Sequence, residues 1–545
     1  MVINNEKKAP KSSKKMFISG VLALTIANIL VKSVGLISKI VLNRVVGSVG
    51  AGYYSSAYEI YAYLYVISTS GLPVALSILV SRSRVRGRIK EAKKIFDISF
   101  IALLVIGLLF SVLMMVFSNQ IAGLIGAPKT ALCIIAIAPT MLFICLSSSL
   151  RGYFQGFQLM TPTAASQLIE AVCKVGIGVG FALWAKSRGY DDYVVSAYTI
   201  LGVTIGVLLG MIYLYIKKLF FKEKSYVIEQ IEHKEESKST KQILKELFVI
   251  AIPITLSSSV LSLTTVIDTL MVQNRLLWSG MNEITVRVYY GDYTSLVISM
   301  FNLPTIFFYP IANALIPLMS GAFEAKNEQR SELIRKISMK IIILIAMPCA
   351  VGLGIFSYPI LNLLMFNSDS VNRAAPWLSI AAASVLFLGI ISATNAFLNS
   401  AGRQKLPIIS MLVGAGAKLI SNYILLDKIG MLGAPISTVI CYLTASALNI
   451  YFTIKHVGKI PNLIRIFTLP LIASILSIGT SALIFIGISI ALPIKIATIL
   501  SILLAVIMYV VLIFKIKAIS REDILLVPKG EKLLKFLSKM GFLAK

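Results

Sequence analysis

Several charged side chains lie inside long apolar stretches of the sequence. Lys32 and Lys39 stand in the first stretch with Arg44 near its end, and Lys174 and Lys418 stand deep in later ones. A lysine or arginine at the centre of a membrane-spanning helix costs about 2.5–3.5 kcal/mol, so such a residue normally faces a cavity or a partner. Lysine binds phosphate as a point charge, and arginine can bind it through two parallel hydrogen bonds. These residues predict a water-filled pathway suited to an anionic substrate.

Lys32 and Lys39 are seven residues apart, which on a helix places them two turns apart on one face. Two interpretations are open for this pair. Either the lysines line a cavity, or an acid such as Glu59 compensates them and their ammonium groups reach the membrane interface. The cavity interpretation suits the two lysines better than Arg44, which lies near the outer end of its stretch.

Two acid–base pairs occur in later apolar stretches. Glu170 and Lys174 are spaced i, i+4, so they can neutralise each other, or Lys174 can face a cavity. Asp268 precedes Arg275 by seven residues and shares its helix face. Glu59, Glu170 and Asp268 are therefore the candidate acids for charge pairing or for coupling to an ion.

A stretch that begins at Arg151 returns in a looser form later in the chain. RGYFQGFQLMTPTAASQLIEAVCK enters an apolar run at Pro162, and NAFLNSAGRQKLPIISMLVGAGAKLISN enters one at Pro407. Proline suits the first turn of a helix, so both copies read as helix, loop and helix. The prolines are 245 residues apart, and the lysines that follow, Lys174 and Lys418, are 244 apart. This long-period repeat predicts two structurally related halves. No acidic residue lies within one turn of Lys418, which makes it the better candidate for a wet pathway.

The elements that must position these residues are membrane helices. Of the 545 residues, 57% are hydrophobic and only 14% are charged, and the apolar residues come in runs of the length that a bilayer requires. We predict an all-α polytopic membrane protein with fourteen transmembrane helices. The candidate spans are roughly residues 17–43, 57–80, 95–117, 131–150, 162–185, 194–216, 244–272, 289–320, 337–358, 376–399, 406–427, 432–454, 464–490 and 495–515.

The formal net charge of +28 raises the question of a nucleic-acid partner. The basic residues cluster in every second loop between apolar runs and form no continuous basic domain. We therefore assign them to the cytoplasmic face and to anionic lipid, expect no nucleic-acid partner, and place both termini in the cytoplasm at the plasma membrane. The five cysteines lie in apolar segments and the two histidines in basic loops, so we expect neither a metal site nor a cofactor.

Charge also divides the chain into parts. A run of mixed charge, KEKSYVIEQIEHKEESKSTK, interrupts the middle of the sequence. We predict two pseudo-symmetric six-helix lobes plus two C-terminal helices. The N-lobe covers residues 1–216, a cytoplasmic linker covers 217–243, the C-lobe covers 244–455, and 456–545 hold the last two helices with a basic tail.

Tyrosines gather around the start of the second apolar run, at Tyr53, Tyr54, Tyr58, Tyr61, Tyr63 and Tyr65. An aromatic belt at the membrane interface explains them more simply than a platform for stacking sugars, and we favour the belt. No P-loop, HExxH, GxSxG or acidic metal motif appears in the sequence, which argues against an ATP-driven pump.

Several segments carry a family resemblance. They are GLPVALSILVSR, RGYFQGFQLMTPTAASQLIEAVCK, DTLMVQNRL, YYGDYTSL and GAGAKLISNYILLDKIGMLGAPISTVICY. They resemble flippases of the multidrug/oligosaccharidyl-lipid/polysaccharide (MOP) exporter superfamily, and within it the stage V sporulation protein B and MurJ-like lipid II flippase branch. The resemblance runs over about residues 17–455. It implies two six-helix lobes around a central cavity lined by cations of the first span, with a groove for a lipid tail at the last two helices.

The resemblance implies alternating access that carries an undecaprenyl-pyrophosphate-linked sugar from the inner to the outer leaflet. We expect a transporter and not an enzyme, with membrane lipids and cell-wall synthesis machinery as further candidate partners. The membrane potential can bias export, and a coupled monovalent ion stays an open alternative. The candidate substrate-binding cations are Lys32, Lys39, Arg44, Arg151, Lys174, Arg275 and Lys418.

Three alternatives compete with this expectation. A cation-coupled multidrug exporter of the same superfamily would have an acid-rich cavity. A membrane-embedded cell-wall glycosyltransferase or polymerase would need a catalytic acid or base beside a large polar loop. A non-enzymatic scaffold for wall synthesis would tolerate the replacement of its buried lysines by leucine.

Overall fold

The computed structural model describes residues 11–221, 239–325, 327–364 and 368–516 of the chain. Side chains of the first helix are described from Leu30 onward with some exceptions, among them Lys32 and Lys39, which lie outside the described side chains. Helices make up all the regular structure in these ranges, which confirms the all-α prediction. Residues 222–238 of the predicted linker and 517–545 of the predicted tail lie outside the described residues.

The described residues form two compact units. Unit 1 contains the chain up to Asn274 together with Glu283–Gly291, and unit 2 contains Arg275–Asn282 together with the chain from Asp292 onward. The chain therefore passes between the units at three places, after Asn274, after Asn282 and after Gly291. Helices α7 (Asp192–Leu219) and α8 (Thr240–Trp278), which follow each other in the chain on either side of the charged segment, both begin in unit 1.

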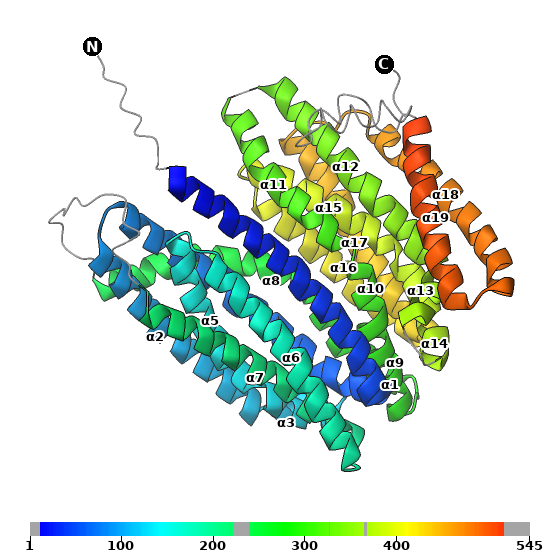
Figure 1. The fold of residues 1–545 in the computed structure, drawn as a ribbon, viewed down its shortest axis with the longest axis horizontal. Coiled ribbons are helices and arrows are strands. Elements are labelled where there is room, and N and C mark those ends of the chain that lie inside the picture. Colours follow the sequence, from blue (N-terminus) through cyan, green and yellow to red (C-terminus); the bar gives the residue numbers. More distant parts are fainter. Residues whose placement is uncertain (1–10, 222–238, 326, 365–367, 517–545) are drawn as a thin grey trace. The chain divides into compact units, whose positions relative to one another are not determined.

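The first helix of unit 1, α1 (Lys11–Val85), is 75 residues long. A straight helix of that length would extend about 110 Å at about 1.5 Å per residue, several times the roughly 30 Å of a bilayer core. The helix is broken at Gly47, whose φ of 78° and ψ of 172° are strained for any residue with a Cβ atom. We call residues 11–46 the first arm and residues 48–85 the second arm; the dark and lighter blue helices of Figure 1 show their bend.

The rest of unit 1 packs around these arms. It consists of α2 (Ile89–Val116), α3 (Ser118–Leu124), α4 (Ala131–Ile137), α5 (Pro139–Gly156), α6 (Thr161–Ser187), α7 (Asp192–Leu219), most of α8 (Thr240–Trp278) and most of α9 (Glu283–Asp292). Helices α6 and α7 pack along each other, and α5 and α6 both contact α1. The backbones of α6 and α7 meet closely at Gly178 and Gly202, because neither residue has a side chain that would keep them apart.

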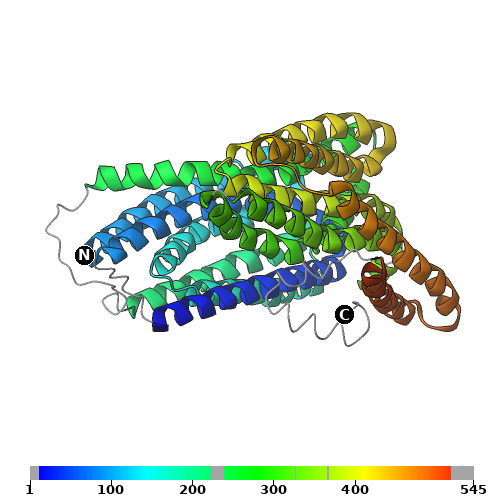
Figure 2. The same ribbon diagram turned by 90° about the horizontal axis from the view of Figure 1, so that it is seen from above.

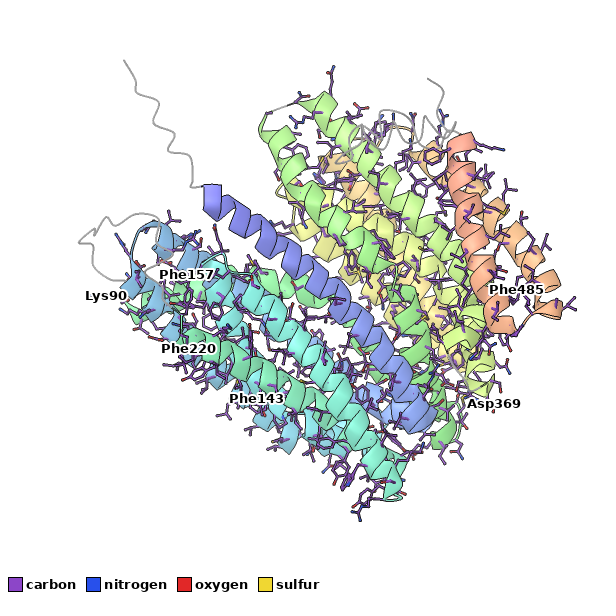
Figure 3. The ribbon with its side chains drawn as sticks, in the orientation of Figure 1. Lys90, Phe143, Phe157, Phe220, Asp369 and Phe485 are labelled. Atoms are coloured by element: carbon purple, nitrogen blue, oxygen red, sulfur yellow. The ribbon has the colours of Figure 1, made fainter. Side chains whose placement is uncertain are left out.

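Unit 2 continues from a six-residue π-helix, η3 (Tyr293–Ile298). Its helices are α10 (Ser299–Asn302), α11 (Thr305–Glu324), α12 (Glu328–Ile355), α13 (Ser357–Leu364), α14 (Ser368–Ala381), α15 (Ala383–Ser400), α16 (Lys405–Ile429), α17 (Gly433–His456), α18 (Leu463–Ala491) and α19 (Ile494–Lys515). Helices α16 and α17 are antiparallel, since Gly414 lies against Ala445 and Gly433 lies against Leu425. The hairpin of α18 and α19, orange and red in Figures 1 and 2, packs on α12 and α13. Phe485 of α18, which is labelled in Figure 3, contacts Phe356 with ring centroids 5.8 Å apart.

Helix α2 carries large apolar residues on its outer face. In α2, Ile101, Val105 and Leu109 recur every four residues and are between 55% and 62% exposed, whereas Ser99 and Gly107 face the protein. This pattern is the reverse of a water-soluble helix and places small residues at helix contacts, as membrane helices do. Phe220, at the end of α7, is 81% exposed in the same way (Figure 3).

Eleven helical stretches among the described residues are long and apolar enough to cross a membrane, or twelve if the bent pair Glu283–Asn302 and Thr305–Ala312 forms one span. One of the eleven, Lys405–His456, contains both α16 and α17. The prediction of a polytopic, multi-pass membrane protein is confirmed. The number of fourteen spans stays a prediction.

Candidate substrate site in a cationic cavity

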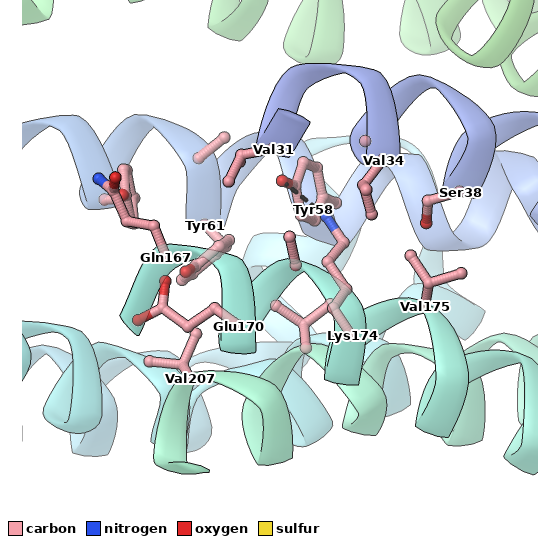
Figure 4. Close-up of a pocket in the computed structure, with 15 residues that line it drawn as sticks. Val31, Val34, Ser38, Tyr58, Tyr61, Gln167, Glu170, Lys174, Val175 and Val207 are labelled. Atoms are coloured by element: carbon pink, nitrogen blue, oxygen red, sulfur yellow. Dashed lines mark hydrogen bonds between the residues drawn. The ribbon is translucent and has the colours of Figure 1, made fainter. Parts of the chain in front are cut away.

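Unit 1 contains a cavity of about 390 Å³ between the two arms of α1 and helices α6 and α7 (Figure 4). Its volume falls in the range of about 300–1,000 Å³ typical of small-molecule sites. Polar and aromatic side chains line one part of it and aliphatic side chains the rest. The polar and aromatic members are Ser38, Tyr58, Tyr61, Tyr65, Gln167, Glu170 and Lys174.

Lys174 reaches into this cavity from α6. Its Nζ atom donates a hydrogen bond of 3.0 Å to the hydroxyl of Tyr58 and lies 4.2 Å from the centroid of the same ring. A hydroxyl and an aromatic face stabilise an ammonium group without neutralising its charge. Among the residues whose contacts are described, no carboxylate is in ion-pair contact with Lys174. The lysine therefore keeps a positive charge on the cavity wall.

Glu170 has a different partner from the one that helix spacing suggests. It forms an ion pair with Arg151 of α5, and the Arg151 Nε atom also donates a hydrogen bond of 3.1 Å to Ser166. Arg151 is 5% exposed and is not among the residues that line the cavity. Because Arg151 compensates Glu170, the i, i+4 neighbour Lys174 is left to a neutral partner. Of the predicted residues, Glu170 and Lys174 thus line one cavity. Arg151 lies outside the lining and contacts Glu170.

The residues predicted on the two arms of α1 are placed less completely. The side chains of Lys32 and Lys39 lie outside those described, although Val31, Val34 and Ser38 of the same arm line the cavity. Arg44 is exposed, and Glu59 of the second arm is buried with 8% of its surface exposed. Their proposed roles stay predictions.

The remaining predicted cations belong to unit 2, and contacts within that unit hold each of them. Arg275 forms an ion pair with Asp427, and its guanidinium carbon lies 3.8 Å from the ring centroid of Tyr423. Lys418 is 2% exposed and donates a hydrogen bond of 3.0 Å to Thr438 Oγ1. The predicted acid Asp268 lies in α8 and is 3% exposed.

Sequence reasoning assigned the tyrosines to the interface, yet three of them line the cavity. Tyr58, Tyr61 and Tyr65 are spaced three and four residues apart, which is the period of a helix face. That spacing could have separated them from Tyr63, which does not line the cavity. Gln167 was missed altogether, because a single glutamine in an apolar run carries no sequence signal of its own.

Polar contacts of buried charged residues with distant segments were also missed. In unit 2, Arg373 pairs with Asp292, a fully buried residue, through two hydrogen bonds of 3.0 and 2.9 Å. In unit 1, Arg287 is fully buried and donates hydrogen bonds to Gln273 and to the carbonyl of Gly126. These partners lie between 14 and 161 residues apart in the sequence, so no local pattern indicates them.

Family models and curated proteins give consistent matches to the chain. The family model described as polysaccharide biosynthesis protein matches residues 17–323, more than half of the chain, and the MatE model matches residues 253–424. Stage V sporulation protein B of Bacillus subtilis (strain 168) is 27% identical over 434 residues, which cover 78% of this chain and 81% of that protein. Lipid II flippase MurJ of the same organism is 23% identical over 457 residues, covering 81% and 82%.

Solved structures share the fold. The structure of lipid II flippase MurJ in an inward closed conformation has a TM-score of 0.71 at 16% identity and covers 90% of this chain and 98% of that chain. An inward-facing multidrug resistance MATE family transporter of the MOP superfamily has a TM-score of 0.63, also at 16% identity, and covers 79% and 97%.

The relatives whose names state an activity are transporters and flippases, not enzymes. This excludes the glycosyltransferase alternative, and the chain is a membrane transporter. The helical fold and the matched sequence agree on the relationship. The chain belongs to the polysaccharide biosynthesis protein family, in the branch of the MOP superfamily that contains stage V sporulation protein B and MurJ.

Proposed function

We propose that this transporter is a flippase that moves a lipid-linked pyrophosphate sugar from the inner to the outer leaflet. The observation that carries the proposal is the charge of the cavity in unit 1. Lys174 contributes a cation held by a neutral tyrosine, while Arg151 compensates the carboxylate of Glu170. A wall of this kind attracts an anionic headgroup, and the relative named lipid II flippase handles such a lipid.

The pyrophosphate binds Lys174, whose ammonium group can turn from the Tyr58 hydroxyl to a phosphate oxygen. At an effective dielectric constant of about 20, opposite charges about 4 Å apart attract by about 4 kcal/mol, which is enough to retain a headgroup that has left water. Lys32, Lys39 and Arg44 of α1, with Arg275 and Lys418, are the further cations that we assign to the pathway. The prenyl chain stays in the bilayer.

Export proceeds by alternating access of two six-helix lobes, residues 1–216 and 244–455, with both termini in the cytoplasm. The potential across the membrane, negative inside, favours the outward movement of negative charge. Each elementary charge contributes about 2.3 kcal/mol per 100 mV, so a headgroup with about two negative charges gains roughly 4–5 kcal/mol. Peptidoglycan, spore-wall and other surface-polymer precursors all share this chemistry.

The test uses purified protein in liposomes with a fluorescent undecaprenyl-pyrophosphate disaccharide, whose exposure outside is read with a membrane-impermeant quencher. We expect protein-dependent translocation that speeds up when a negative-inside potential is imposed. Lys174→Gln should lower the rate at least tenfold and Lys174→Arg should retain most of it. Lys186→Gln, an exposed lysine of the same helix, is the matched control. Absence of translocation at every potential would refute the proposal.

A cation-coupled multidrug exporter is the rival, because the MatE model matches residues 253–424 and MATE transporters share the fold. Such an exporter binds organic cations, and the pairing of Glu170 with Arg151 leaves the unit 1 cavity poorly suited to them. In the same liposomes, transport of a cationic dye driven by a sodium or proton gradient would favour this rival.

A further inference from the structure

Four tyrosines of the second arm of α1 form a continuous ladder of rings. Tyr54 and Tyr58 stack with centroids 5.7 Å apart and planes 14° apart; Tyr61 lies 5.7 Å from Tyr58 and Tyr65 lies 5.9 Å from Tyr61. The last three rings line the cavity. An aromatic surface about two helical turns long therefore faces the space that Lys174 enters.

The opposite wall holds an amide whose oxygen lacks a donor. Gln167 of α6 lines the cavity, and its buried Oε1 atom accepts no hydrogen bond from any residue that the structure describes. A buried acceptor of this kind is costly unless a bound molecule supplies a donor. The cavity thus offers an aromatic face and an acceptor for a hydroxyl or amide hydrogen.

The polar groups are ordered along the cavity. Gln167, Glu170 and Lys174 follow one another on one face of α6, and Figure 4 shows Lys174 beside Tyr58, Tyr61 near Glu170, and Gln167 at the other end. A phosphate held at Lys174 would have its attached group directed along the tyrosines toward Gln167. The group that follows the pyrophosphate in a lipid-linked saccharide is a sugar.

We propose that Tyr58, Tyr61 and Tyr65, together with Gln167, form a subsite for the sugar ring. This subsite rests on the proposed flippase function. A pyranose has an apolar C–H face that packs against an aromatic ring and a polar edge whose hydrogens the Gln167 oxygen accepts. The cavity of about 390 Å³ has room for a short saccharide. A prenyl chain would leave the amide oxygen of Gln167 without a donor and could not compensate the charge of Lys174. The aliphatic part of the wall therefore does not decide which ligand binds.

The test compares two ligands on the full-length protein in detergent micelles by native mass spectrometry. One is undecaprenyl pyrophosphate carrying a disaccharide, and the other is undecaprenyl pyrophosphate without sugar. Tyr61→Leu and Tyr65→Leu should weaken binding of the first about three- to tenfold and leave the second unchanged, as expected for the loss of one aromatic contact. Tyr63→Leu, on the same helix but outside the cavity lining, is the matched control.

Two more variants keep the test decisive if a leucine variant folds poorly. Tyr61→Phe retains the ring and should bind the disaccharide lipid nearly as wild type, whereas Gln167→Met removes the acceptor at similar volume and should weaken that lipid alone. Equal losses for both lipids, or no loss for either, would overturn the sugar subsite and leave the flippase proposal standing. A wild-type protein that binds neither lipid would overturn both.

Discussion

Replacing Glu170 by glutamine should lower the free energy of unfolding, because Arg151 would then be a buried cation without a charged partner. Glu170 and Arg151 join α6 to α5, and their side chains are only 14% and 6% exposed. Glutamine keeps an oxygen that can accept the Arg151 hydrogen bond but removes the compensating charge. The guanidinium would then be left with two neutral partners, the hydroxyl of Ser166 at 3.1 Å and the hydroxyl of Tyr65.

The magnitude follows from this burial. Removing one partner of a buried ion pair costs about 3–5 kcal/mol, because the other charge stays buried without compensation. We expect the loss of stability in Glu170→Gln to lie near the low end of this range, at about 3 kcal/mol, because the amide oxygen retains a hydrogen bond. Arg151→Met should cost a similar amount. The double variant should be more stable than the sum of the single effects predicts, with an interaction energy of about 2–3 kcal/mol.

The free energy of unfolding is measured by titrating sodium dodecyl sulfate into mixed micelles that contain the wild type, each single variant and the double variant. Glu328→Gln is the control, because Glu328 pairs with Arg335 at 2.7 Å but is 67% exposed. Arg335 also keeps hydrogen bonds to the carbonyls of Val457 and Lys459, so the control should cost less than about 1 kcal/mol. Additive single effects, or equal losses for Glu170→Gln and the control, would refute the reasoning.

Two further predictions concern packing and charge elsewhere. Gly202→Ala should destabilise the protein by about 1–3 kcal/mol, seen as a lower thermal midpoint, because its methyl group would collide with the backbone of Gly178; Gly180→Ala, whose methyl group meets nothing within 4 Å, should not. Arg373→Met leaves the carboxylate of Asp292 buried and should cost about 3–5 kcal/mol in the same detergent titration, and adding Asp292→Asn should recover part of it; no recovery would show that the pair is not coupled.

Much of the fold could be predicted from the sequence, because the length and spacing of apolar runs dictate membrane helices directly. The break at Gly47 was harder to predict. The first two predicted spans lie in one helix, and only its backbone angles show where the two arms separate. The number of spans depends on such breaks, which hydropathy alone does not locate.

The candidate site was predictable only in part. Charge in an apolar run indicated Lys174 and Glu170, yet helix spacing could not show that Glu170 pairs with Arg151, since that pair depends on α5 lying beside α6. The tyrosines posed a different problem. An amphipathic ring suits both a membrane interface and a wet cavity, so composition favoured the belt while packing placed Tyr58, Tyr61 and Tyr65 around an internal space.

The three passages of the chain between the units have a consequence for transport. All lie between Asn274 and Asp292, and the last leads straight into the π-helix Tyr293–Ile298, a rare backbone form that is frequent at functional sites. Any displacement of one unit against the other must be absorbed by torsions within this short segment. The charged loop ahead of α8 joins two helices of the same unit, so lengthening or cutting it would leave the mechanical coupling intact.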